Sequence, residues 1–340
     1  MKPQKKILSV FIATAFLFPM VNNAQQKQEE QHAKIPKVVA NLMEGNLPTR
    51  NAKLDIPLSY VQTLYFPYQN DYFSIFIFKI KNQDLNYASP LQTVEQKQET
   101  EQNVSQEEQS LTCAADFFFR FYSVGDNGQV KSIHKEIYLP YSDQVDPKEY
   151  NPEEENIYAF GTIFPPGRYL LSAAAVSLNS AKIGLIFQDI YLPSSLEFKK
   201  SLGLTPLFFV KNMKRIPAPD SSIILYKNRF HYATLEIEPY FEHEFSQNEK
   251  LDIFYFILGL APTEEGTFKF EVSYTYKKDN EDILKFEPRM ETIPAPIVSV
   301  PLDLSFQDKK IDPGVYILEI SIKDQTSKRE GIKNIDFIVK

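Results

Sequence analysis

One segment of this chain of 340 residues occurs twice, and this internal repeat constrains the possible architectures more than any other feature. The sequences PPGRYLLSAAAVSLNSAKIGLIFQDIYL and DPGVYILEISIKDQTSKREGIKNIDFIV align without a gap at a constant offset of 147 residues, as from Pro166 to Pro313. Two copies at this spacing predict two similar domains in tandem, each of ordinary size. The positions with identical residues in both copies are Pro166, Gly167, Tyr169, Leu171, Ser180, Gly184 and Asp189.

Short β patterns separated by turn residues fill both halves of the chain. Hydrophobic residues alternate over 72–80 and again over 268–276, as in strands with one buried face. No window of about 12 residues in these halves has helical periodicity. The sequence therefore predicts an all-β protein with two tandem Ig-like β-sandwich domains, 51–193 and 204–340.

The two copies differ in length between their early strands. Residues 72–78 match 251–257 at an offset of about 179, whereas Phe121 matches Val272 at an offset of 151. The first copy therefore carries extra residues, and its loop 88–112 is rich in Gln and Glu. We expect this insert to be a polar surface loop.

The repeated Pro-Gly pair predicts a turn, because Pro fixes φ near about −65° and Gly accepts the positive φ of a type II turn. The Tyr two residues after each Gly begins the next strand. Its hydroxyl can hydrogen-bond the loop backbone, as corner tyrosines do in β-sandwiches. We expect these six residues to be structural. They are Pro166, Gly167, Tyr169, Pro313, Gly314 and Tyr316.

The N-terminus has the three parts of a secretory signal, which predicts export to the periplasm or the cell surface. A basic end precedes the apolar run Ile7–Met20, which is too short to span a bilayer, and small and polar residues follow it. We expect a signal peptide over 1–24 and a polar tether over 25–50. The alternative is that the apolar run stays uncleaved and acts as an anchor.

Composition excludes several classes of partner. The formal net charge of −7 argues against binding to nucleic acid or to anionic lipid. The single cysteine, Cys113, rules out a disulfide framework. After the signal, no second apolar stretch is long enough to span a membrane, so we expect no span in the mature chain. No phosphate-binding loop, dinucleotide fingerprint, nucleophile elbow or zinc-protease motif is present. We expect no cofactor and no catalytic residues.

Three groups of residues were weighed as sites of chemistry. His231 and His243 flank one strand and would share a metal only if a hairpin folded between them, so solvated positions are favoured. The loop 142–156 is crowded with carboxylates, but it has prolines where a calcium loop commonly has Gly, and calcium binding there stays open. Cys113 has no positive neighbour to lower its pKa, which favours a structural thiol over a nucleophile.

One resemblance carries information about function. The pattern P-P-G-x-Y-x-L, then S-x-K-x-G, then D-I-x-L resembles the closing strands of Ig-like domains in secreted bacterial proteins. It is most similar to the β-sandwich regions that accompany GWxTD-motif proteins, over about 28 residues per copy. The GWxTD motif itself is absent, because the chain has no Trp. The resemblance implies an envelope or extracellular role and implies no site residues.

Together these observations predict an exported, non-enzymatic binding or structural module of the bacterial cell envelope. Its partner would be an envelope or extracellular protein that it meets through loops or a strand edge. The alternative is a carbohydrate-binding or accessory module of a glycan-degrading system, with exposed tyrosines such as Tyr138 or Tyr141 as the platform. Three coplanar exposed aromatic rings would favour glycan, and a contiguous apolar patch would favour a protein.

Overall fold

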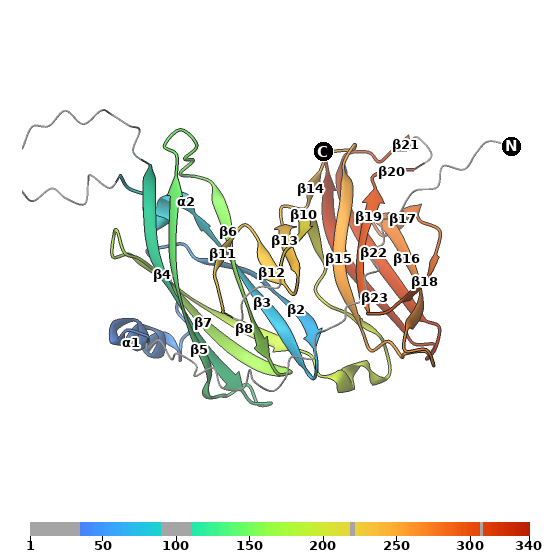
Figure 1. Cartoon of the computed structure of the whole chain (residues 1–340), viewed down its shortest axis with the longest axis horizontal. Helices are drawn as coiled ribbons and strands as arrows, with labels where there is room; N and C mark the ends of the chain where they lie inside the picture. The colour runs from blue at the N-terminus through green and yellow to red at the C-terminus, as the bar shows by residue number, and fades with distance from the viewer. Residues whose placement is uncertain (1–34, 90–109, 218–221, 307–308) are drawn as a thin grey trace, which may run out of the picture. The chain divides into compact units, whose positions relative to one another are not determined.

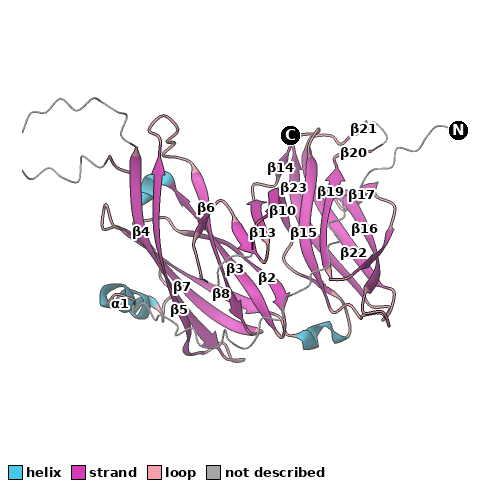
Figure 2. Cartoon of the chain, in the orientation of Figure 1, coloured by secondary structure: helices cyan, strands magenta, loops and turns pink. Residues whose placement is uncertain are grey.

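The computed structural model of the chain describes residues 35–89, 110–217, 222–306 and 309–340. Strands and turns make up nearly all of this part (Figure 2). Most strand pairs are antiparallel, whereas β14 (Glu244–Phe245) runs parallel to β23 (Glu330–Val339). This architecture confirms the predicted all-β sandwich fold. No helix in the described residues is long and apolar enough to cross a membrane.

The chain divides into two compact units. The N-terminal unit holds the described part of Glu30–Leu192 together with Arg215–Glu236. The C-terminal unit holds Pro193–Lys214 and Ile237–Lys340. The predicted signal peptide and the first part of the predicted tether, up to residue 34, lie outside the described residues.

The N-terminal unit contains a five-stranded and a four-stranded sheet (Figure 1). Phe rings from both sheets fill the space between them. Phe76 of β3, Phe119 of β4 and Phe160 of β6 have no exposed surface, and the ring centroids of Phe119 and Phe160 lie 4.3 Å apart. The five-stranded sheet has the order β1 (Lys53–Leu54), β8 (Ile183–Leu192), β7 (Gly167–Ser177), β4 (Leu111–Val124), β5 (Val130–Val145). The four-stranded sheet has the order β11 (Tyr226–Lys227), β6 (Glu155–Phe164), β3 (Asp71–Lys81), β2 (Ser59–Tyr68).

The C-terminal unit has two larger sheets and a core of tyrosine and aliphatic side chains. Tyr255 of β15 and Tyr274 of β16 are buried between the sheets with their hydroxyl oxygens 3.0 Å apart. One sheet contains β13 (Leu235–Tyr240), β10 (Phe208–Arg215), β15 (Lys250–Leu258) and β19 (Ile297–Asp303), with β9 (Gly203–Leu204) also on β15. The other contains β14, β23, β22 (Gly314–Asp324), β16 (Phe268–Lys278) and β17 (Glu281–Lys285), with β18 (Arg289–Ile293) also on β16. The short strands β20 (Ser305–Phe306) and β21 (Lys309–Lys310) pair with each other.

The sequence repeat corresponds to one hairpin built twice. Gly167 pairs with Leu192 across β7 and β8, and Gly314 pairs with Val339 across β22 and β23. Every other pair of the two hairpins keeps the same offset of 147 residues. The ungapped alignment therefore reflects an identical strand register.

The repeated glycine in the second strand of each hairpin has a steric cause. A Cβ at Gly184 would lie 2.4 Å from the backbone oxygen of Ile56, and one at Gly331 would lie 2.8 Å from that of Leu202. In both units an incoming segment therefore crosses the hairpin so closely that only glycine fits.

The register also corrects one detail of the internal alignment. Phe121 lies opposite Leu171 and Tyr276 lies opposite Leu318. Because Leu171 and Leu318 are equivalent, Phe121 corresponds to Tyr276 at an offset of 155, and the match of Phe121 to Val272 is wrong. The error of four residues is even, so it leaves every side chain on its predicted face.

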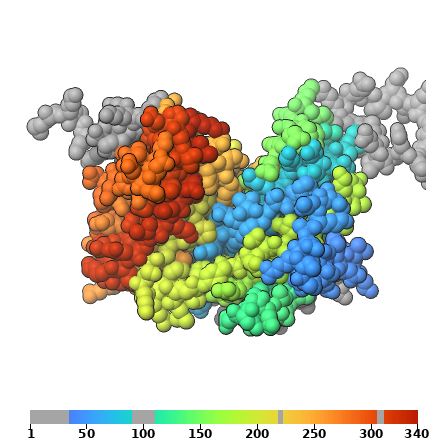
Figure 3. Space-filling model, turned by 180° about the vertical axis from the view of Figure 1, so that it is seen from behind, coloured from blue at the N-terminus to red at the C-terminus, as the bar shows by residue number. Residues whose placement is uncertain are grey.

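The second half of the predicted tether is not extended. Residues Lys37–Asn46 form the helix α1, which lies against the outer face of the five-stranded sheet. Val39 and Met43 of α1, together with Ile35, pack on Phe118, Ala174 and Leu185. In Figure 3 the residues of this segment, in blue, form a continuous surface with the green residues of the sandwich. The prediction of a polar tether over 25–50 therefore fails for residues 35–46, because Val39 and Met43, four residues apart, give this short helix a buried face and Ile35 packs beside it.

An ion-pair network fastens α1 to the sheet. The Arg120 side chain of β4 is only 6% exposed. Its Nη1 donates to Oε1 of Glu44 in α1 at 2.8 Å, and its Nε donates to Oε1 of Glu136 in β5 at 2.6 Å. One buried guanidinium thus links the helix and two strands.

The two ends of the Gln- and Glu-rich insert are joined by a β-bridge. Ala88 and Thr112 pair in an isolated bridge, with both N–H···O distances at 2.9 Å. Residues 90–109 of the predicted insert 88–112 lie outside the described residues. Just before the bridge, the one-turn helix α2 (Asn82–Leu85) follows β3.

The segment Arg215–Glu236 belongs to the N-terminal unit, which differs from the predicted second domain 204–340. Tyr226 pairs with Ala159, so that β11 extends the four-stranded sheet. Phe230 and Tyr232 of β12 (Phe230–Tyr232) are buried, and the Tyr232 ring lies 4.7 Å from that of Phe66. The burial of these aromatic rings holds the segment on the first sandwich.

Candidate binding pocket

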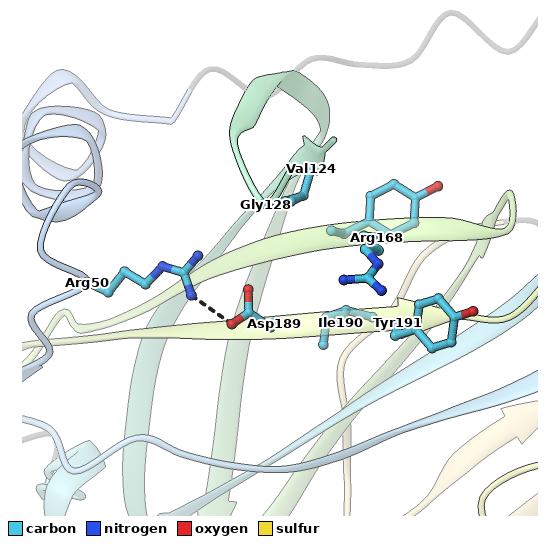
Figure 4. A pocket seen from close by; sticks show the side chains of 8 residues that line it. Arg50, Val124, Gly128, Arg168, Asp189, Ile190 and Tyr191 are labelled. Atoms are coloured by element: carbon cyan, nitrogen blue, oxygen red, sulfur yellow. Dashed lines mark hydrogen bonds and ion pairs between the residues drawn. The ribbon is translucent and has the colours of Figure 1, made fainter. Parts of the chain in front are cut away.

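The outer face of the five-stranded sheet has a pocket of about 430 Å³ (Figure 4). Helix α1 packs on the same face, over Phe118, Ala174 and Leu185. The pocket lies further along that face, where β7 begins, β8 ends and the β4–β5 hairpin turns. It is lined by Arg50, Val124, Gly128, Arg168, Tyr169, Asp189, Ile190 and Tyr191.

Strand register brings the two central side chains of the pocket together. Arg168 of β7 pairs with Val124 of β4 on one side and with Tyr191 of β8 on the other. Paired residues in neighbouring strands project from the same face of a sheet. The Arg168 guanidinium therefore lies over the Tyr191 ring, 5.6 Å from its centroid, in a cation–π contact.

The second arginine reaches the pocket from the segment that follows α1. Nη1 of Arg50 donates to Oδ2 of Asp189 at 2.7 Å, as Figure 4 shows. Arg50 has a left-handed backbone with φ of 53°, and its N–H donates to the carbonyl of Asn46 at 2.7 Å. A non-glycine residue pays for this conformation in strain, and such strain collects at ligand sites and turns. The helix end and Asp189 together fix the position of the Arg50 side chain.

The polar groups of the pocket are suited to binding. Two guanidinium groups and one carboxylate give the lining a net positive charge, within a chain of formal net charge −7. Burial raises the pKa of the Tyr169 hydroxyl to about 12. That hydroxyl donates to the carbonyl of Pro165 at 2.8 Å. That bond uses the one hydrogen of the hydroxyl, so the two guanidinium groups are what favours an anionic ligand.

The predicted turn and corner residues adopt equivalent positions in the two units. The Tyr316 hydroxyl donates to the carbonyl of Asp312 at 2.7 Å, as Tyr169 does to Pro165. Gly167 and Gly314 have φ values of 159° and 153°, which are positive but far from the value of about +80° in a type II turn. Of the six predicted residues, Tyr169 lines the pocket. The turn residues Pro166 and Pro313 precede these glycines.

The two histidines weighed as metal ligands lie in different units. His231 has its Nε2 2.9 Å from Oε2 of Glu236, and its ring packs on Tyr226. The ring of His243 packs edge-on against Phe209, with centroids 5.0 Å apart. Within the described ranges, no cluster of three His, Cys, Asp or Glu side chains could hold a metal ion.

Asp143 of the acidic loop is engaged within the protein. Its Oδ2 accepts hydrogen bonds from the Tyr87 hydroxyl at 2.6 Å and from Lys227 Nζ at 2.8 Å. Burial raises the pKa of Asp143, but the bonds from Lys227 and Tyr87 outweigh it and hold the pKa below its usual value. Cys113 beside this group is buried, and burial raises the pKa of its thiol. These groups form a structural polar cluster.

The tyrosines considered as a glycan platform are partly covered. The Tyr138 hydroxyl donates to Asp116 at 2.8 Å while its ring stacks on Phe118. Tyr141 packs edge-on against Phe117. Among the side chains whose burial is described, Tyr191 is the one exposed aromatic residue, with 51% of its surface accessible. A platform of three exposed rings is therefore not found in this part of the chain.

Reasoning from the sequence missed Arg50, Arg168 and Tyr191 as pocket residues. The repeat contained the signal for two of them. At the offset of 147 residues, Arg168 corresponds to Val315 and Tyr191 corresponds to Ile338, and Val315 also pairs with Ile338. The same pair of positions is thus cationic and aromatic in one unit and aliphatic in the other.

No protein-family model and no curated protein sequence matches this chain. Among solved structures, Salmonella alpha-2-macroglobulin reacted with methylamine matches over 85% of this chain and 17% of its own, with 10% identity and a TM-score of 0.16. A β-D-glucuronidase from Dictyoglomus thermophilum matches over 85% of this chain and 45% of its own, with 13% identity and a TM-score of 0.15. The chain therefore spans less than half the length of either protein.

Proposed function

We propose that the protein is an exported, non-enzymatic binding module of the bacterial cell envelope, and that its partner is another protein. The signal-like N-terminus and the resemblance to envelope Ig-like domains support export. The observation that carries the binding role is the edge strand β5, which ends the order of the five-stranded sheet.

Strand β5 is long and accessible. It runs for 16 residues and, within the described part of the chain, pairs only with β4. Its residues 131–134 are all exposed, and Ile133 has 47% of its surface accessible. An edge strand of this kind offers backbone hydrogen-bonding groups and a side-chain pattern to an added strand of a partner.

The glycan-binding alternative has less support. Protein sites for sugars use exposed aromatic faces, and Tyr191 is the one exposed aromatic side chain described. One face of its ring already carries the Arg168 guanidinium. A single ring that is partly covered makes a poor stacking platform.

The test is capture of the partner from the envelope fraction of the protein's own cells, with Ile133→Lys as the edge variant. The matched control is Ile283→Lys, because Ile283 is 49% exposed and lies on β17, the end strand of a sheet in the C-terminal unit. We expect the wild type and the control to capture the same protein and the edge variant to lose most of it. Equal capture by all three chains would overturn the role of β5. Mass spectrometry of the recovered chain tests export as well, since an intact residue 1 on exported material would contradict signal cleavage.

A further inference from the structure

We propose that the pocket between β7, β8 and the β4–β5 turn binds a carboxylate from an acidic segment of the protein partner. This inference rests on the proposed function, because it takes the partner to be a protein. It adds the chemistry of one contact that this partner makes.

Arg168 is the group in the pocket that is available to a ligand. The Arg168 side chain is exposed, and its guanidinium lies over the face of the Tyr191 ring. Among the described residues, no carboxylate forms an ion pair with it. Stacking uses the face of a guanidinium and leaves its N–H edge for a planar, bidentate acceptor. A carboxylate has this geometry.

The charge of the pocket favours a single carboxylate over a phosphate. Asp189 already accepts a hydrogen bond from Arg50 at 2.7 Å, so two arginines and one aspartate leave one positive charge to be balanced. A carboxylate carries one negative charge, whereas a phosphate group carries more at neutral pH and would face Asp189 unbalanced. The remaining N–H groups of Arg50 supply further donors around the same space.

The C-terminal unit contains a natural comparison for this site. It has the same hairpin in the same register, but Val315 and Ile338 stand where the N-terminal unit has Arg168 and Tyr191. The scaffold therefore does not require a cation or an aromatic ring at these positions. Their presence in the N-terminal unit calls for another explanation, and recognition of an anion provides one.

The experiment measures binding of a fluorescein-labelled hexaglutamate peptide by anisotropy, with the chain from Gln25 onward. Arg168→Gln removes the charge, and Arg168→Val reproduces the C-terminal copy. Arg289→Gln in β18 is the matched control, because it makes the same charge change in the other unit. We expect both Arg168 variants to bind about fivefold more weakly at low salt, the effect of one exposed ion pair, and the control to bind like the wild type. Added salt should reduce the difference, because it screens exposed charges.

Two competitors and the captured partner define the outcomes that would overturn the proposal. The first competitor is inorganic phosphate and the second is a glucuronic acid disaccharide. If either of them bound in a manner that depends on Arg168 while the peptide did not, the pocket would belong to another ligand class. Equal peptide binding by the Arg168 variants and the control would show that the peptide binds elsewhere. If Arg168→Gln also captured the envelope partner as well as the wild type while Ile133→Lys did not, the pocket would be refuted and the protein-binding role would stand.

Discussion

Replacement of Met43 by Ala should loosen helix α1 from the sandwich. Met43 has no exposed surface, and its side chain packs in the cluster formed with Phe118, Ala174 and Leu185. Loss of the thioether arm removes about 2 kcal/mol of transfer free energy, and the cavity left behind adds to this. Because α1 lies at the surface and can shift to close the gap, we expect a total cost of about 2 to 3 kcal/mol, at the lower end of the range for such substitutions.

The assay is hydrogen exchange of the amides of α1. An isolated helix of ten residues is unstable in water, so protection of these amides reports docking on the sheet. The expected cost corresponds to a loss of protection of about 30- to 150-fold. The control is Val38→Ala on the same helix, where the side chain is 72% exposed and the change should stay within about 0.5 kcal/mol. Equal protection in the two variants would show that Met43 does not hold the helix in place.

Three other changes test the structure. Gly314→Val should destabilise the C-terminal unit by about 1 to 3 kcal/mol, because residues with a Cβ rarely adopt its φ of 153°. An equal shift in the thermal transition of the N-terminal unit would contradict independent units. Asp143→Asn should reduce the amount of unfolding free energy that the protein loses at acidic pH. A carboxylate with a lowered pKa stabilises the fold above its unfolded pKa of about 3.9 and loses this effect as the pH falls further. The measurement is urea titration of the wild type and this variant at pH 7 and pH 3. An equal loss of unfolding free energy in the two chains would rule out a contribution from the pair of Asp143 with Lys227. Deletion of 90–109 with a short turn in its place should preserve cooperative unfolding of the N-terminal unit, since shortening a loop changes its closure entropy only modestly. Loss of the sharp unfolding transition would show that the insert packs on the unit.

The fold class and the repeated hairpin could be predicted because both depend on local patterns. Alternation of side chains identifies strands, and an ungapped match fixes a shared register. The match of Phe121 to Val272 failed for a reason inherent in strands. A shift by an even number of residues keeps every side chain on its face, so the pattern alone does not distinguish the offset of 151 from the offset of 155 seen in the pairing.

Helix α1 and the pocket were missed for a different reason, which is that tertiary contacts define them. The helix has only ten residues, and only Val39 and Met43 among them are buried, which is too short an apolar pattern to predict a helix from the sequence. The pocket takes Arg50 from the end of this helix and Arg168, Asp189 and Tyr191 from two strands. No window of sequence contains all four residues. The divergence of Arg168 and Tyr191 from Val315 and Ile338 was nevertheless visible at the repeat offset.

Two hairpins of identical register in one chain also create a hazard during folding, because a strand of one copy can pair where the other copy belongs. The cores of the two units oppose this exchange. Ala173 and Ala175 of β7 lie opposite Phe119 and Phe117, whereas the equivalent Ile320 and Ile322 of β22 lie opposite Tyr274 and Val272. All four of the alanine and isoleucine side chains are fully buried. An exchanged β22 would force two isoleucines against phenylalanines in a space shaped for alanine, at a cost of about 1 to 3 kcal/mol for each overpacked site. The volumes of these side chains thus direct each hairpin to its own sheet and act against misassembly of the tandem repeat.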